Sequence, residues 1–133
     1  MAISLHAISE TKETNSYFLL PTAEGTELVN SNKLVRVEAI SNYSRLFFSN
    51  GRSLVVAKVL AWFEEKLAEH GFVRTHRSHL VNMYYISKIK MEKQGILVLK
   101  NKEEIAVAKR KKQELKSSIR RFIEYQNNGA FRA

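Results

Sequence analysis

The chain has 133 residues, of which 44% are hydrophobic and 26% charged, and this length and composition predict one soluble domain. The sequence contains no apolar run of membrane-spanning length and no secretory signal, so we expect a cytoplasmic location. Cysteine and aspartate are both absent, which excludes disulfides, thiolate nucleophiles, cysteine-based zinc sites and the phosphoacceptor of a receiver domain. The formal charge is +9, and because residues 1–30 hold one lysine against four glutamates, the remaining chain carries +12 and favours a polyanionic partner.

The N-terminal part of the domain shows a strand pattern. Residues 1–16 are polar without a clear period, and we expect a flexible arm there. The domain is predicted to cover residues 17–125. Its first strands are expected at residues 17–20 and 34–40, with a turn over residues 21–25 between them. In the second strand, apolar residues alternate at Val35, Val37 and Ala39.

A hairpin and a helix follow. Residues 46–48 and 54–56 flank Asn50-Gly51, a dipeptide that supplies the positive φ angles of a tight primed turn. Helical spacing then appears over residues 59–67, and Gly71 is placed as the residue just past the end of this helix.

The second half of the domain repeats the strand pattern and ends in a helix. Strands are expected at residues 72–76, 80–81, 86–89, 96–99 and 105–107. A C-terminal helix is predicted over residues 111–125, and a frayed tail over residues 126–133. The fold class is therefore mainly β, with one short enclosed helix and a C-terminal helix.

One segment, residues 72–82, alternates strand-like apolar residues with side chains that bind phosphates or base edges. The candidates for DNA binding here are Arg74, His76, Arg77 and Ser78. For His76 and Asn82 the alternative is that each satisfies local backbone groups. His76 and His79 make only a weak metal pair, because their three-residue spacing suits a helix and this stretch has a strand pattern, so we expect no metal site.

Two further groups of residues suit nucleic acid. Seven positive charges fall between residues 109 and 121, enough for several phosphate contacts, although a solvated basic face without a partner is the alternative. The candidates from this run are Lys109, Arg110, Lys111, Lys112 and Lys116. A polar loop is expected at residues 41–45, where Asn42, Tyr43, Ser44 and Arg45 suit insertion into a groove or form an ordinary turn.

The residues do not indicate an enzyme. No nucleophile with a base and an orienting acid can be assembled from the sequence, and no glycine-rich phosphate loop is present. We therefore expect no catalytic residues and no cofactor.

Taken together, these segments resemble the LytTR DNA-binding domain of bacterial response regulators, over residues 17–122. The most specific marker is the stretch from Phe72 to Asn82, with Arg74, His76, Arg77 and Ser78 at the family's spacing. The other two markers are residues 37–44 and residues 105–110.

The resemblance implies an elongated fold of small antiparallel sheets whose loops enter successive DNA grooves, with contacts on the Ser44 loop, Arg77 and Lys109. It also implies paired direct repeats in promoters, with two copies of the domain, and hence a possible homodimer, on one site. The family usually has Ser-Arg where this chain has Ala108-Lys109, and lysine lacks the planar fork of arginine. Without room for a receiver domain, the chain is expected to stand alone, with concentration, a partner or a ligand as its input.

The leading hypothesis is sequence-specific binding of duplex DNA and transcriptional regulation. The alternative is a module in which Trp62, the last helix and the basic run bind an acidic protein or an anionic membrane surface. RNA binding is a third hypothesis, but the basic run lacks the interleaved aromatic residues of a single-strand stacking surface.

Overall fold

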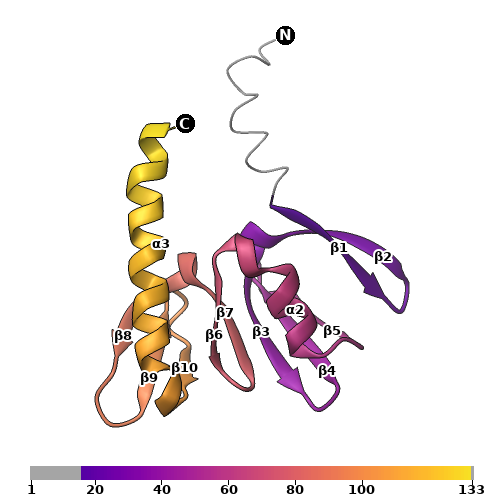
Figure 1. Ribbon diagram of the computed structural model, residues 1–133. Coiled ribbons are helices and arrows are strands. Elements are labelled where there is room, and N and C mark those ends of the chain that lie inside the picture. Colours follow the sequence, from indigo (N-terminus) through magenta and orange to yellow (C-terminus); the bar gives the residue numbers. More distant parts are fainter. Residues whose placement is uncertain (1–15, 133) are drawn as a thin grey trace.

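The computed structural model describes residues 16–132, and within them strands form three antiparallel sheets (Figure 1). The two-stranded sheet pairs β1 (Tyr17–Thr22) with β2 (Gly25–Asn30). The five-stranded sheet has the order β5-β4-β3-β7-β6, and the three-stranded sheet has the order β10-β9-β8. The strands of these two sheets are β3 (Leu34–Ile40), β4 (Tyr43–Phe48), β5 (Ser53–Val56), β6 (Phe72–His76), β7 (His79–Asn82), β8 (Ile86–Lys90), β9 (Gly95–Leu99) and β10 (Glu104–Val107).

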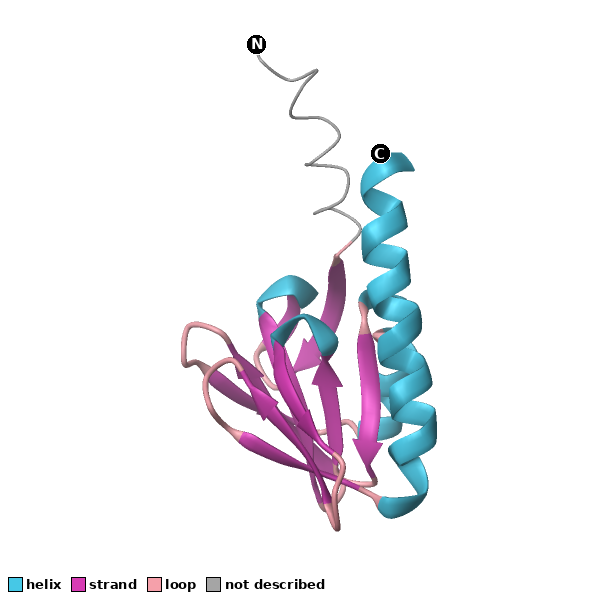
Figure 2. Ribbon diagram, turned by 90° about the vertical axis from the view of Figure 1, so that its left-hand side faces the viewer, coloured by secondary structure: helices cyan, strands magenta, loops and turns pink. Residues whose placement is uncertain are grey.

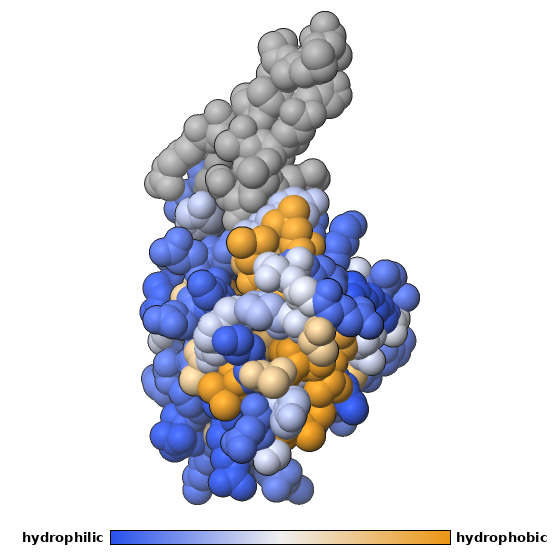
Figure 3. Space-filling view, turned by 90° about the vertical axis from the view of Figure 1, so that its right-hand side faces the viewer, coloured by the Kyte–Doolittle hydropathy of each residue, from blue (hydrophilic) through white to orange (hydrophobic). Residues whose placement is uncertain are grey.

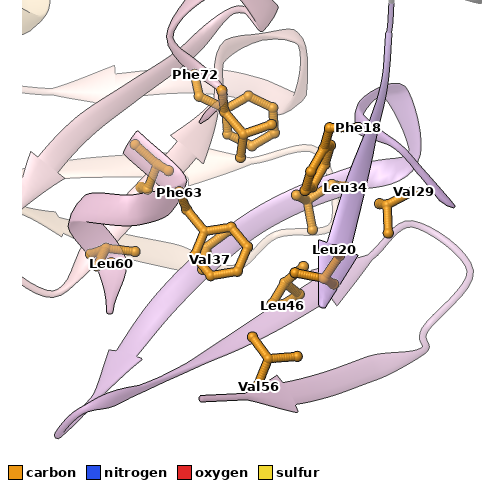
Figure 4. Close-up of a cluster of buried hydrophobic side chains, with 12 residues drawn as sticks. Phe18, Leu20, Val29, Leu34, Val37, Leu46, Val56, Leu60, Phe63 and Phe72 are labelled. Atoms are coloured by element: carbon orange, nitrogen blue, oxygen red, sulfur yellow. The ribbon is translucent and has the colours of Figure 1, made fainter. Parts of the chain in front are cut away.

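The five-stranded sheet is covered on both faces. Helix α2 (Leu60–Lys66) and the β1–β2 hairpin pack on one face, where Phe63, Leu20, Leu34 and Leu46 are fully buried (Figure 4). The three-stranded sheet and helix α3 (Lys112–Arg132) enclose a second core, which includes Val81, Leu97, Leu99 and Leu115. The expected fold class is confirmed, with the sheets following one another across the molecule.

Strand β3 contributes to both cores, and a bulge decides which of its residues face which core. Register shifts between Leu34 and Arg36, and as a result Val35 lies in the second core, whereas Leu34 and Val37 lie in the first. The predicted alternation of Val35, Val37 and Ala39 on one face is therefore wrong at Val35. An extra residue in one strand moves the following side chains to the other face, which a period-two pattern does not reveal.

Strand β2 was not predicted, and the expected turn at residues 21–25 is shorter. Pro21 and Thr22 belong to β1, where they pair with Thr26 and Gly25. A proline is tolerated there because β1 has a partner on one edge only. The sequence gives little signal for β2, since its outer face exposes Leu28 and only Val29 is buried.

The hairpin between β4 and β5 is confirmed, but its turn differs from the primed turn that was predicted. Gly51 has a φ of 92°, whereas Asn50 is not in the left-handed region. The Gly51 amide donates to the Phe48 carbonyl and the Phe48 amide donates to the Arg52 carbonyl. This pattern is a three-residue loop that ends in a glycine bulge, which also accounts for the Asn-Gly pair.

Both predicted helices exist with different ends. Helix α2 ends at Lys66, a 3₁₀ turn covers Ala68–His70, and Gly71 then adopts a φ of 84°. A Cβ at Gly71 would lie 3.3 Å from the Phe122 ring, so this glycine also lets α3 approach the sheet closely.

Helix α3 continues to Arg132, beyond the predicted end at Tyr125 and through the segment expected to fray. Its first half lies along the three-stranded sheet and its second half extends past it (Figure 2). No helix within residues 16–132 is both long enough and apolar enough to cross a membrane. The predicted N-terminal arm, apart from Ser16, lies outside the described residues.

Candidate nucleic-acid interface

Three chain reversals that carry the predicted site residues lie at one end of the molecule, at the bottom of Figures 1 and 2. They are the β3–β4 turn at residues 41–42, the β6–β7 turn at residues 77–78, and the junction between β10 and α3 at residues 108–111. Figure 3 shows that apolar side chains gather on the side of the β1–β2 hairpin, whereas the bottom end is hydrophilic.

Backbone hydrogen bonds hold these reversals together. The Ala39 amide donates to the Ser78 carbonyl over 2.9 Å, which joins the end of β3 to the β6–β7 turn. The Ala108 amide donates to the Thr75 carbonyl over 2.8 Å, and the buried Thr75 hydroxyl donates to the Ala106 carbonyl. The five-stranded and three-stranded sheets are thus bonded to each other directly behind the candidate interface.

The β3–β4 turn is shorter than the loop predicted from the sequence. Only Ser41 and Asn42 form the turn, and Tyr43, Ser44 and Arg45 already belong to β4. Asn42, Tyr43 and Arg45 are exposed, whereas Ser44 is fully buried and its hydroxyl donates to the Lys58 carbonyl over 2.7 Å. Ser44 therefore attaches this hairpin to the segment before α2, and its hydroxyl is not at the surface where a DNA contact was predicted.

Arg74 organises the β6–β7 turn from within. Its guanidinium donates to the carbonyls of His76 and Arg77, over 3.0 Å and 2.6 Å, and forms an ion pair with Glu64 of α2 at 2.6 Å. These bonds occupy the Arg74 side chain and hold the turn in place, while the DNA contact of Arg74 stays a prediction. The sequence could not distinguish it from Arg77, because both are arginines in the same motif.

The turn presents Arg77 to solvent. The Arg77 side chain is exposed and makes no ion pair or side-chain hydrogen bond with the residues that the structure describes, 16–132. His76 and Ser78 are half-buried, and the Ser78 amide donates to His76 Nδ1 over 3.1 Å. A neutral His76 ring therefore carries its proton on Nε2, which is left as a donor.

Two residues of the motif point into the protein, and Asn82 is the one whose hydrogen bonds serve the fold. Asn82 is buried; its amide nitrogen donates to the carbonyls of Ser31 and Leu34, and its oxygen accepts from the Tyr84 amide. For Asn82 the local backbone alternative is thus correct. The His79 ring lies 5.4 Å from that of His76, and burial lowers the pKa of His79, an effect that nearby Glu38 opposes.

The basic run from residue 109 divides into free and occupied side chains. Lys109, Arg110 and Lys116 are exposed and have no side-chain partner among the described residues. Lys111 lies 3.6 Å from Glu114. The Lys112 ammonium donates to the carbonyls of Met91 and Lys93 in the β8–β9 loop, so it is bonded within the fold, while its DNA contact stays a prediction.

A pair of charged groups fixes the spacing between the two sheets. The Arg36 guanidinium is buried, donates to both carboxylate oxygens of Glu103 over 3.0 Å and 3.1 Å, and bonds Glu38 over 3.2 Å. It also lies 3.8 Å from the centre of the Phe47 ring. Arg36 is in β3 and Glu103 precedes β10, so this network connects the two sheets that carry the interface.

Comparisons with known proteins show the family through one match and the fold through another. The family model described as LytTr DNA-binding domain matches residues 24–120. Among solved structures, the chain is similar to the LytTr DNA-binding domain of a protein described as a methyl-accepting/DNA response regulator from Bacillus cereus. The TM-score is 0.67 at 24% identity, and the match covers 78% of this chain and 96% of that one. No curated protein sequence matches.

Proposed function

The chain belongs to the LytTr DNA-binding domain family, and from this premise we propose that it binds specific duplex DNA sequences and regulates transcription without catalysis. The observation that carries the proposal is the cluster of chain reversals at one end of the molecule. They are joined by backbone hydrogen bonds and present Arg77, Lys109 and Arg110 without partners among residues 16–132.

We assign different tasks to these side chains. Arg77 projects from a rigid turn, and an arginine can bind the N7 and O6 atoms of guanine with two parallel hydrogen bonds. Residues beside Arg77 and on the β3–β4 hairpin suit further groove contacts. They are His76 and Ser78 next to Arg77, Asn42 in the β3–β4 turn, and Tyr43 and Arg45 at the start of β4. Lys109, Arg110 and Lys116 carry point charges and suit phosphates. We also propose that the protein acts in the cytoplasm and that two copies of the domain bind one site made of paired direct repeats.

The alternative of a partner-binding module has less support. It includes Trp62 among the binding residues, but Trp62 is half-buried against the first core and packs edge-to-face on Phe63 with ring centroids 4.9 Å apart. Lys58 and Lys66 lie over its ring at 5.3 Å and 5.5 Å. A tryptophan in this setting stabilises α2 on the sheet.

Salt and competition experiments test the proposed partner. We expect the dissociation constant for duplex DNA to rise steeply with salt, because phosphate contacts release condensed cations. In a plot of log Kd against log salt concentration, each phosphate contact should add about +0.9 to the slope. We also expect the preferred duplex to compete better than single-stranded RNA or heparin. A flat salt dependence would contradict the proposal, and stronger competition by RNA or heparin would favour the other hypotheses.

A further inference from the structure

A fourth chain reversal lies at the same end of the molecule, and neither the predicted motifs nor the basic run includes it. It is the β8–β9 loop, residues 91–94, next to the start of α3 in Figure 1. An open groove of about 550 Å³ separates this loop from the other turns, and its lining includes His76, Lys93, Gln94 and Lys109. The loop thus borders the same surface as the proposed DNA contacts.

The loop is held firmly against β10 and α3. At Gly95, a Cβ would lie 2.9 Å from Val107 Cβ and 3.1 Å from Lys112 Cε, so only glycine allows this approach. The Lys112 ammonium donates to the carbonyls of Met91 and Lys93 from the other side. The loop therefore keeps a fixed position relative to Lys109, as a contact surface must if it is to meet a rigid duplex.

Lys93 occupies a backbone conformation that glycine or asparagine adopts more readily. Its φ is 53°, in the left-handed region. Its side chain is exposed, and across the described part of the chain its ammonium forms no ion pair or hydrogen bond. Lys102, in the β9–β10 turn, has the same kind of conformation, so what distinguishes Lys93 is its place beside the groove.

The charges around the loop are mainly positive. Lys90 and Lys93 are exposed, and Lys109 and Lys112 face the loop from the junction, whereas the carboxylates nearby are Glu92 in the loop and Glu104 in the groove lining. The carbonyl bonds of Lys112 anchor its charge beneath the loop. A phosphodiester placed over the groove would meet Lys93 on one side and Lys109 on the other.

We propose that the β8–β9 loop is a fourth DNA contact, in which the Lys93 ammonium binds a backbone phosphate on the flank beyond the segment that Lys109 reaches. The inference rests on the proposed function and enlarges the length of DNA that the domain contacts. A lysine on a phosphate carries no base information, so this contact holds the domain in register and contributes affinity on any duplex.

The test compares Lys93→Gly and Lys93→Arg with a matched control, Lys100→Ala. Lys100 is also exposed but follows β9 at its other end. We expect Lys93→Gly to weaken binding to preferred and random duplexes alike, by about threefold or more at low salt, and to lower the salt slope by about 0.9. Lys93→Arg should retain the wild-type slope, and Lys100→Ala should not change it.

A loss of binding in Lys93→Gly will not be due to unfolding. Glycine relieves the positive φ, so this variant should be at least as resistant to urea as the wild type. Phosphate ethylation interference supplies the position: one flanking phosphate should interfere with wild-type binding and not with Lys93→Gly. An unchanged slope and an unchanged interference pattern in Lys93→Gly would overturn the fourth contact while leaving the proposed function intact. If the wild type showed no interfering phosphates at all, the proposed function itself would fail.

Discussion

Replacing Arg77 with alanine should reduce affinity for the preferred duplex by about 1–3 kcal/mol, which is roughly 5-fold to 150-fold, and affect random duplex much less. The exposed guanidinium lies on a turn that Arg74 fixes through the carbonyls of His76 and Arg77, so its loss removes a base contact without disturbing a buried group. Titrations of both proteins against both duplexes measure the difference.

Lys116→Ala is the matched control for this prediction. Lys116 is exposed on α3 without a side-chain partner among the described residues, and as a phosphate contact it should weaken all duplexes about equally and lower the salt slope by about one. Both proteins should unfold as cooperatively as the wild type. Equal losses on preferred and random DNA in Arg77→Ala would show that Arg77 holds the backbone and does not read bases.

The largest effect on stability is expected at the connection between the sheets. Glu103→Ala should lower the free energy of unfolding by about 2–3 kcal/mol, because it leaves the buried Arg36 guanidinium with Glu38 as its remaining carboxylate partner. This value is below the usual cost of breaking a buried pair because the Glu103 side chain is 39% exposed. Arg36→Met should cost less, about 1 kcal/mol, since methionine keeps an apolar contact with Phe47 and water can solvate the freed carboxylate.

Glu27 and Arg52 provide a control with the same bidentate geometry. Their contacts of 2.7 Å and 3.0 Å lie at the surface, and Glu27→Ala should therefore cost less than about 1 kcal/mol. Urea denaturation of the three variants gives the comparison. Equal losses in Glu103→Ala and Glu27→Ala would contradict the stabilising role assigned to the buried pair.

The Arg36–Glu103 pair also predicts a dependence on pH. Its hydrogen bonds lower the pKa of Glu103 in the folded chain. The corresponding stability is present above the ordinary pKa of a glutamate and is lost as the pH falls through the lowered value. Glu103→Ala should therefore lose less stability than the wild type on acidification.

The sequence predicts most of the strands well because apolar runs and turn residues mark them directly. The sequence does not indicate which polar or charged side chains are bonded to other parts of the fold. Lys109 and Lys112 look alike in a run of four cations, yet Lys109 is free and Lys112 bonds carbonyls about twenty residues earlier. The Ser44 hydroxyl bonds the Lys58 carbonyl, and Arg74 bonds Glu64 as well as the carbonyls of His76 and Arg77 in its own turn.

Lys93 is a residue that the sequence analysis left out of the candidate site. Residues 91–94 form an unremarkable polar turn in the sequence, and nothing near them suggests a nucleic-acid contact. Their relevance arises from topology, because pairing β8, β9 and β10 brings the loop to the end of the sheet where Lys109 lies. The one sequence feature that could have drawn attention to this loop is Gly95. It directly follows the turn and lies where β9 comes closest to Val107 of β10.

Selection of bound duplexes from a random DNA pool tests the central claim most directly. If the domain reads bases through Arg77 and the neighbouring turns, successive rounds should enrich one short motif, present as a direct repeat when two copies bind. Repeating the selection with Arg77→Ala should relax the motif at the position that Arg77 contacts. If the wild type bound the pool with high affinity but enriched no motif, the domain would bind DNA through phosphates alone, and the claim of sequence-specific regulation would be contradicted.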